Sequence, residues 1–118
     1  MNVLIVYAHP EPKSFNGAMK DLAVETLTKA VHEGVVSDLY AQNFDPVAGP
    51  HDVTERLNSD YFNLALEQGN AADNDLFPPD IQAEIDKVRA ADFLLVQFPM
   101  WWTSVPAILK GWIDRVLA

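Results

Sequence analysis

Cysteine is absent from this sequence of 118 residues. Its absence excludes disulfide bonds and thiolate metal sites, and it agrees with a protein of the reducing cytoplasm. The three histidines, His9, His32 and His51, show no ligand spacing to one another or to carboxylates. We therefore expect no metal site.

Long apolar runs are missing as well. No stretch approaches the roughly 18 apolar residues that suggest a membrane-spanning helix, so we expect no membrane span. The first residues enter a strand pattern directly, without the basic region of a signal peptide. A cytoplasmic location is the expectation that follows.

Basic residues are few: 8 lysines and arginines stand against 17 acidic residues, which gives a formal net charge of −9. Binding to nucleic acid or to an anionic membrane depends on lysine and arginine, so both are disfavoured. A single anionic ligand remains compatible with this charge, because local backbone N–H groups can hold one phosphate.

Strand-like and helix-like segments alternate along the chain. Such alternation predicts an α/β domain with a parallel sheet covered by helices on both faces. If the second and third strands flank the first, in the order 2-1-3, the winding reverses beside the first strand, and ligands bind beyond the strand ends at such a reversal. The predicted strands are 2–7, 35–40 and 93–98, and the predicted helices begin near residues 15, 80 and 105.

Helix caps and apolar stripes can be predicted for these helices. Ser14, Asp80 and Ser104 are candidate N-caps, and Gly34 fits the stop of the first helix. Helical spacing predicts buried faces in the first and last helices. The face of the first helix consists of Phe15, Met19, Leu22, Ala23, Thr26, Leu27, Ala30 and Val31. The face of the last helix consists of Val105, Ile108, Leu109, Trp112, Ile113 and Val116.

Residues 41–79 form a long connection with four prolines and little periodicity. Leu57, Tyr61, Leu64 and Ala65 could line one short helix within it. Long connections of this kind are often functional or mobile.

The loop after the first strand ends at a predicted helix start. Free N–H groups at a helix N-terminus suit a phosphate. His9, Lys13, Ser14 and Asn16 can add donors or charge, and Gly17 allows a close approach. A capped helix after a proline turn would look the same, so this loop alone is a weak signal.

Two adjacent tryptophans, Trp101 and Trp102, follow the third strand. Indole rings stack on flat conjugated rings, and the backbone N–H groups of residues 100–103 can reach heteroatoms on a ring edge. Alternatively, both tryptophans are core or dimer-interface residues, and we expect this of one of the two, because adjacent residues usually point in different directions. Trp112 lies on the helical stripe and is predicted to be core. No acid–base pair of carboxylates stands out.

At these loops the chain resembles the flavodoxin-like NAD(P)H quinone oxidoreductases. The matching segments are Val3–Asn16, Ser37–Ala41, Gln97–Trp102 and Val105–Trp112, and 48–77 is the variable part. The resemblance implies a three-layer α/β/α fold, a bound FAD (FMN in some relatives) and two-electron reduction of quinones by NAD(P)H in a ping-pong hydride transfer. The implied cofactor-binding residues are His9, Lys13, Ser14, Phe15, Asn16, Pro99, Met100, Trp101, Trp102 and Thr103.

Family members are usually homodimers and carry five strands. By this resemblance, residues 1–118 form a single domain that lacks its last two strands, and the family's tyrosine and histidine near the flavin would lie beyond Ala118. No catalytic residue can therefore be assigned. A fragment of a longer protein is the favoured interpretation, and completion by another chain is the other. Alternative functions are an azo- or nitroreductase, a flavodoxin-like regulatory or flavin-binding module without turnover, and a remnant that binds nothing.

Overall fold

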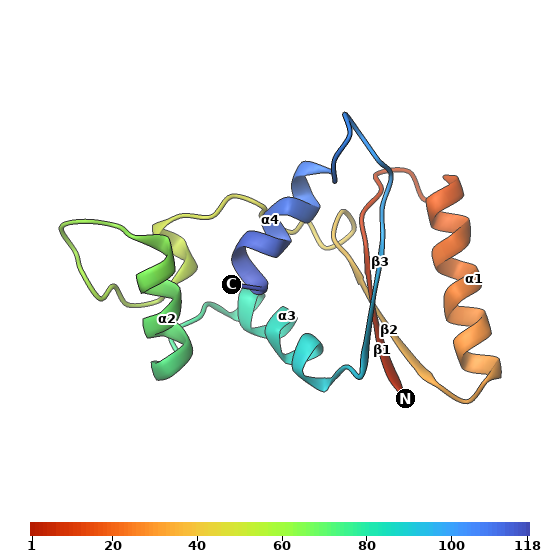
Figure 1. Cartoon of the computed structure of the whole chain (residues 1–118), viewed down its shortest axis with the longest axis horizontal. Helices are drawn as coiled ribbons and strands as arrows, with labels where there is room; N and C mark the ends of the chain where they lie inside the picture. The colour runs from red at the N-terminus through yellow and green to blue at the C-terminus, as the bar shows by residue number, and fades with distance from the viewer.

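A computed structural model describes residues 1–118. Three parallel strands form one sheet in the order β2-β1-β3, with α1 on one face and α3 and α4 on the other (Figure 1). The predicted α/β class and the 2-1-3 order are confirmed. The elements are β1 Asn2–Tyr7, α1 Phe15–Lys29, β2 Glu33–Asp38, the short 3-10 helix η1 Pro50–Asp52, α2 Leu64–Asn74, α3 Pro79–Ala90, β3 Phe93–Gln97 and α4 Ala107–Val116.

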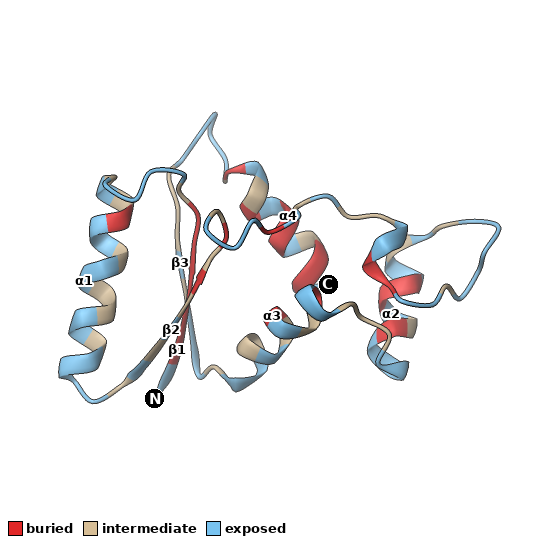
Figure 2. Ribbon diagram, turned by 180° about the vertical axis from the view of Figure 1, so that it is seen from behind, coloured by how far each residue is buried: buried red, intermediate tan, exposed pale blue.

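The central strand β1 carries the core, because both of its faces are covered. Residues 3–8 are all buried, and Figure 2 shows this strand in red. One face packs on α1 through Val3, Ile5 and Tyr7. The other face joins the larger core cluster of Leu4, Val6, Ala8, Leu39, Phe44, Leu109, Trp112 and Val116. The prediction that Trp112 is core is confirmed.

The end of α1 lies earlier than predicted. The helix stops at Lys29, and Val31 takes the left-handed backbone conformation with φ 63°. Gly34 is therefore not the stop but part of β2, which begins at Glu33 instead of Val35. His32 lies between the two elements, where the terminal amino group of Met1 is 3.3 Å from its Nδ1.

The predicted buried face of α1 is only partly correct. Ala23 and Leu27 pack against β1, but most of the other apolar side chains of the stripe are exposed, Phe15 and Val31 most of all at 77% and 90%. β3 is an edge strand of the sheet, so no further strand lies beside it to cover these apolar side chains. Met19 and Leu22 instead line an open apolar groove between α1 and β3, of about 540 Å³.

Two of the predicted helix caps are wrong. Prolines precede both helices: Pro78 is the N-cap of α3, and Pro106 is the N-cap of α4. Asp80 lies inside the first turn of α3, and Ser104 closes the loop before α4. In α4 the predicted stripe is otherwise confirmed, except that Ile113 is 37% exposed.

The long connection forms an arm beyond α4, away from the sheet (Figure 1). Its helix, α2, begins at Leu64, so the predicted positions Leu57 and Tyr61 lie in the preceding loop and are exposed. The buried carboxylate of Glu67 holds that loop by accepting hydrogen bonds from the backbone N–H groups of Leu57 and Asn58. Gln68 ties the arm to α4 by donating to the carbonyl of Asp114 at 2.8 Å.

None of the helices is both long enough and apolar enough to cross a membrane.

Candidate functional site

The carboxyl ends of β1 and β3 lie side by side and bring the two loops together. Tyr7 is paired with Gln97, and the N–H of Ala8 donates to the carbonyl of Gln97 at 3.0 Å. The rings of His9 and Trp101 meet edge to face, with 5.9 Å between centroids. The structure therefore places the two loops at one end of the sheet, where the winding reverses.

The first loop presents the N-terminus of α1. The Ser14 hydroxyl oxygen accepts a hydrogen bond from Gly17 N–H at 3.0 Å, which confirms the predicted cap. The backbone N–H groups of Phe15 and Asn16 donate to no protein acceptor, and Lys13 is exposed and forms no ion pair. Free donors and one cation at a helix N-terminus fit a phosphate.

A glycine is required in the first turn of α1. A Cβ at Gly17 would lie 2.4 Å from the carbonyl oxygen of Pro12 and 3.1 Å from the Tyr7 hydroxyl. Real Cβ atoms do not approach backbone so closely, so Gly17 allows the proline loop to fold against the helix start. The Tyr7 hydroxyl lies buried beneath this turn and has no hydrogen-bond partner.

The imidazole of His9 has a defined tautomer when neutral. Its Nδ1 accepts a hydrogen bond from the backbone N–H of Glu11 at 2.9 Å. The proton of the neutral ring therefore lies on Nε2, which becomes a donor. His9 is half-buried and supported by the Trp101 ring, so this donor is held in one orientation.

The second loop closes as a tight turn. Trp101 and Ser104 exchange two backbone hydrogen bonds of 3.0 and 3.1 Å. The residues between them, Trp102 and Thr103, have φ values of 51° and 62°. Two left-handed central residues are typical of a type I′ turn, which favours Asn-Gly. A tryptophan followed by a β-branched threonine is therefore strained here, and such strain is concentrated at functional sites.

This turn displays aromatic surface to solvent. Trp102 is 97% exposed and Trp101 is 40% exposed, so the alternative that one of them is a core residue is wrong. The backbone N–H groups of Met100, Trp102 and Thr103 donate to no protein acceptor. Pro99 is half-buried and starts the loop. The loop offers flat apolar rings with free backbone donors beside them.

One residue of the site escapes the sequence patterns. Gln97, the last residue of β3, donates from Nε2 to Oδ1 of Asn16 at 2.5 Å. The two residues are 81 positions apart, and the bond joins the strand end to the first turn of α1. No periodicity or motif indicates such a contact. The available signals were a polar side chain at the end of an otherwise apolar strand and the place of Gln97 in a segment that carries the family resemblance.

A second lysine, Lys20, lies close to the first loop. Lys20 lies over the ring of Tyr7, with 5.0 Å between Nζ and the ring centroid. The hydrogen bond from its ammonium group to Asp21 raises the pKa of Lys20 above its usual range. Lys20 therefore remains a cation behind the loop, on the side of Tyr7.

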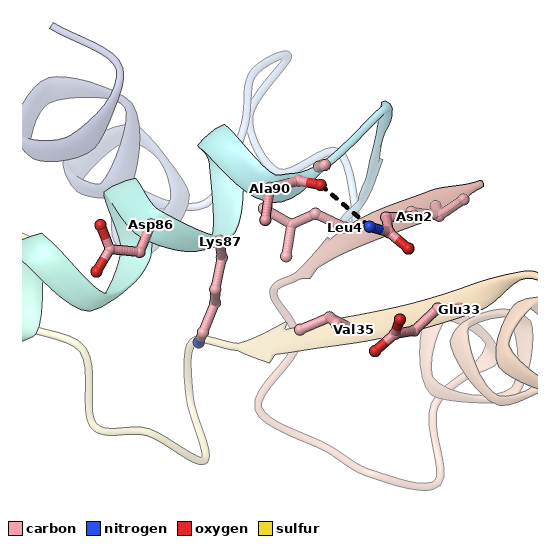
Figure 3. Close-up of a pocket in the computed structure, with 9 residues that line it drawn as sticks. Asn2, Leu4, Glu33, Val35, Asp86, Lys87 and Ala90 are labelled. Atoms are coloured by element: carbon pink, nitrogen blue, oxygen red, sulfur yellow. Dashed lines mark hydrogen bonds between the residues drawn. The ribbon is translucent and has the colours of Figure 1, made fainter.

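Another hollow lies away from the two loops. It has a volume of about 300 Å³ and opens between α3 and the amino-terminal ends of β1 and β2 (Figure 3). It is lined by Asn2, Glu33 and Lys87 among others, and Asn2 donates to the carbonyl of Ala90 at 3.4 Å inside it. This hollow lies at the opposite end of the strands from the two loops. No group of side chains that could hold a metal ion is present anywhere in the chain.

The donor set of the two loops fits a flavin. Free N–H groups, Lys13 and the His9 Nε2–H suit the phosphates, while the exposed indoles suit a flat ring with heteroatoms along its edge. The Lys13 side chain and the Trp102 ring are exposed to solvent, so a ligand can reach both.

Comparison with known proteins agrees with this geometry. A family model described as the flavodoxin-like fold matches residues 1–118. The chain belongs to the flavodoxin-like fold family. Ribosyldihydronicotinamide dehydrogenase (quinone) of Homo sapiens is 52% identical over 116 residues, which is 98% of this chain and 50% of the relative. NAD(P)H dehydrogenase (quinone) 1 of Rattus norvegicus is 50% identical over 115 residues, 97% of this chain and 42% of the relative.

A solved structure of a related protein has a closely similar backbone over the matched residues. A structure described as a putative quinone reductase from Klebsiella pneumoniae superimposes with a TM-score of 0.94 at 44% identity, covering 98% of this chain and 45% of that one. The chain spans about half the length of the curated relatives that it matches.

Proposed function

We propose that the two loops bind a flavin, with FAD favoured and FMN as the alternative, in an NAD(P)H quinone oxidoreductase. The observation that carries the proposal is the edge-to-face contact of His9 with Trp101, because it joins the loop that leads to the free N–H groups of α1 to the exposed tryptophan turn. His9, Lys13, Ser14, Phe15 and Asn16 would hold the phosphates. Pro99, Met100, Trp101, Trp102 and Thr103 would pack on the ring.

A bound flavin supplies ping-pong hydride chemistry, in which two electrons arrive from a dihydronicotinamide and leave to a quinone. The residues of this chain contribute binding and orientation. Trp102 and Thr103 are held in one backbone conformation by the Trp101–Ser104 bridge, so their N–H groups would need little further ordering to bind a ring. The proposal includes a homodimer of the full-length form, as the resemblance implies, and a cytoplasmic location, which the absence of cysteine favours. The names of the relatives support the quinone and nicotinamide substrates.

We infer further that the domain is completed by another segment on the free edge of β3. Phe93, Leu94 and Val96 are exposed on this edge, beside the apolar groove along α1. An exposed apolar edge strand is a site for strand pairing. The lengths of the relatives support such a segment.

Nicotinamide oxidation tests the proposed reaction. The protein is loaded with FAD, and loss of NADH or NADPH is followed with and without a simple naphthoquinone. We expect oxidation that depends on both flavin and quinone. Retained flavin with no oxidation of either nucleotide would support a binding module without turnover, and it would overturn the proposed reaction for this polypeptide.

A further inference from the structure

We propose that Gln97 is a positioning residue that fixes the side-chain amide of Asn16 for an anionic ligand. This inference rests on the proposed function, because it concerns how the first loop receives a phosphate. It extends that function by assigning a role to a side chain outside the two loops. The observation behind it is the hydrogen bond from Gln97 Nε2 to Asn16 Oδ1.

The position of the Gln97 amide is determined by the sheet. Its carbonyl accepts from the N–H of Ala8, and β3 pairs with β1 along its whole length. The side chain therefore leaves a rigid strand end and reaches across to α1. Both Gln97 and Asn16 are half-buried, which limits the competition of water for the bond.

The direction of this bond decides what Asn16 offers to a ligand. An asparagine amide has one acceptor oxygen and one donor nitrogen. Because Oδ1 already accepts from Gln97, the free end is Nδ2, which carries two donors. The bond also polarises the Asn16 amide, so that its N–H groups become stronger donors. With the opposite orientation, Asn16 would present an oxygen to the phosphate and repel it.

The same region shows other preset donors. The free backbone N–H groups of Phe15 and Asn16 and the Nε2–H of His9 lie on the same loop. A fixed Asn16 amide would add two side-chain donors to this set. That arrangement is suited to an anion and unsuited to a cation or a neutral acceptor-poor ligand.

The first experiment measures the bond direction without any ligand. NMR couplings across hydrogen bonds are recorded on labelled protein. We expect a coupling between Gln97 ¹⁵Nε2 and Asn16 ¹³Cγ. A coupling between Asn16 ¹⁵Nδ2 and Gln97 ¹³Cδ would show the reverse orientation and overturn the inference, whatever the protein binds.

The second experiment is a double-mutant cycle on FMN and FAD binding, followed by flavin fluorescence. Asn16→Ala should weaken binding about tenfold or more, and Gln97→Met about three- to tenfold. If Gln97 acts through Asn16, Gln97→Met has no further effect in the Asn16→Ala background. Independent, additive effects would mean that Gln97 merely stabilises the strand end, and the inference would fail.

Controls separate the possible failures. Circular dichroism and thermal unfolding check the folding of each variant, and Gln97→Leu replaces Gln97→Met if the latter is unfolded. Riboflavin, which lacks the phosphate, should be insensitive to Gln97→Met; equal losses for riboflavin and FMN would contradict an anion-directed role. Absence of flavin binding by the unaltered protein would overturn the proposed function, and with it the ligand-directed part of this inference. The NMR coupling would still report the direction of the Gln97–Asn16 bond in that case.

Discussion

Arg115 and Asp52 form an ion pair that is closed off from solvent. Arg115 Nε lies 2.9 Å from Asp52 Oδ1, and each side chain is 1% exposed. The same guanidinium donates to the carbonyl of Asp45 and lies 3.3 Å from Asp80 Oδ2. One side chain of α4 thus holds η1, the start of the long connection and α3 together.

Removal of one partner of this pair should destabilise the protein strongly. Asp52→Ala leaves the buried Arg115 charge without its closest carboxylate, and a cost of about 3–5 kcal/mol is expected. Chemical unfolding measures the loss. The control is Asp114→Ala, which breaks the exposed 2.7 Å pair with Lys110 and should cost about 0–1 kcal/mol. Similar losses in both variants would show that burial of the Arg115 pair has no special effect.

Glu84 should make stability depend on pH in the acid range. Its burial raises the pKa, but hydrogen bonds from Lys87, Ser37 and Trp112 outweigh this, and the net pKa lies below the usual 4.5. Ionised Glu84 therefore contributes stability that is fully present above about pH 4.5 and is lost as pH falls through the lower folded value.

Glu84→Gln removes that contribution. The free energy of unfolding of the variant should be lower at neutral pH, and its decline below about pH 4.5 should be shallower than that of the unaltered protein. Urea unfolding across pH measures both. Glu25→Gln, in an exposed pair with Lys29, is the matched control and should leave the curve unchanged. An unchanged acid decline in Glu84→Gln would refute this assignment.

A substitution that relieves the strain in the turn after β3 should stabilise the protein and weaken flavin binding. Thr103 has φ 62°, a left-handed conformation that strains a β-branched residue but not glycine. Thr103→Gly should therefore raise the free energy of unfolding by about 0.5–1 kcal/mol, a net value that includes the entropy that glycine loses on folding. Thr103→Ala should give a smaller gain. Flavin binding should weaken in Thr103→Gly, because the turn is less ordered. A loss of stability in Thr103→Gly would contradict the strain argument.

Much of this architecture could be predicted from the sequence. The apolar run in β1 and the alternation of elements indicated the parallel sheet, and the loop composition indicated where a ligand could bind. The exposed stripe of α1 could not be predicted, because helical periodicity reports an apolar face but not whether anything covers it. The Gln97–Asn16 and Arg115–Asp52 contacts were also beyond prediction, since they join residues 81 and 63 positions apart.

The groove between α1 and β3 should bind apolar probes. It is lined by Met19, Leu22 and Phe93 among others and contains no acidic side chain, although the net charge of the chain is −9. A naphthalene-sulfonate dye should gain fluorescence with the protein and lose most of that gain in Met19→Lys with Leu22→Lys. Leu66→Lys, which changes an exposed leucine of α2, is the control. Dye binding that survives the double change would place the apolar surface elsewhere.

The central claim is that the two loops bind a flavin, and a fluorescence titration of FAD and FMN with the protein tests it most directly. Saturable quenching at one flavin per chain is expected, with affinity reduced about tenfold or more in Asn16→Ala and also reduced in Trp102→Ala. Flavin fluorescence and absorbance that stay unchanged by an excess of folded protein would contradict the claim.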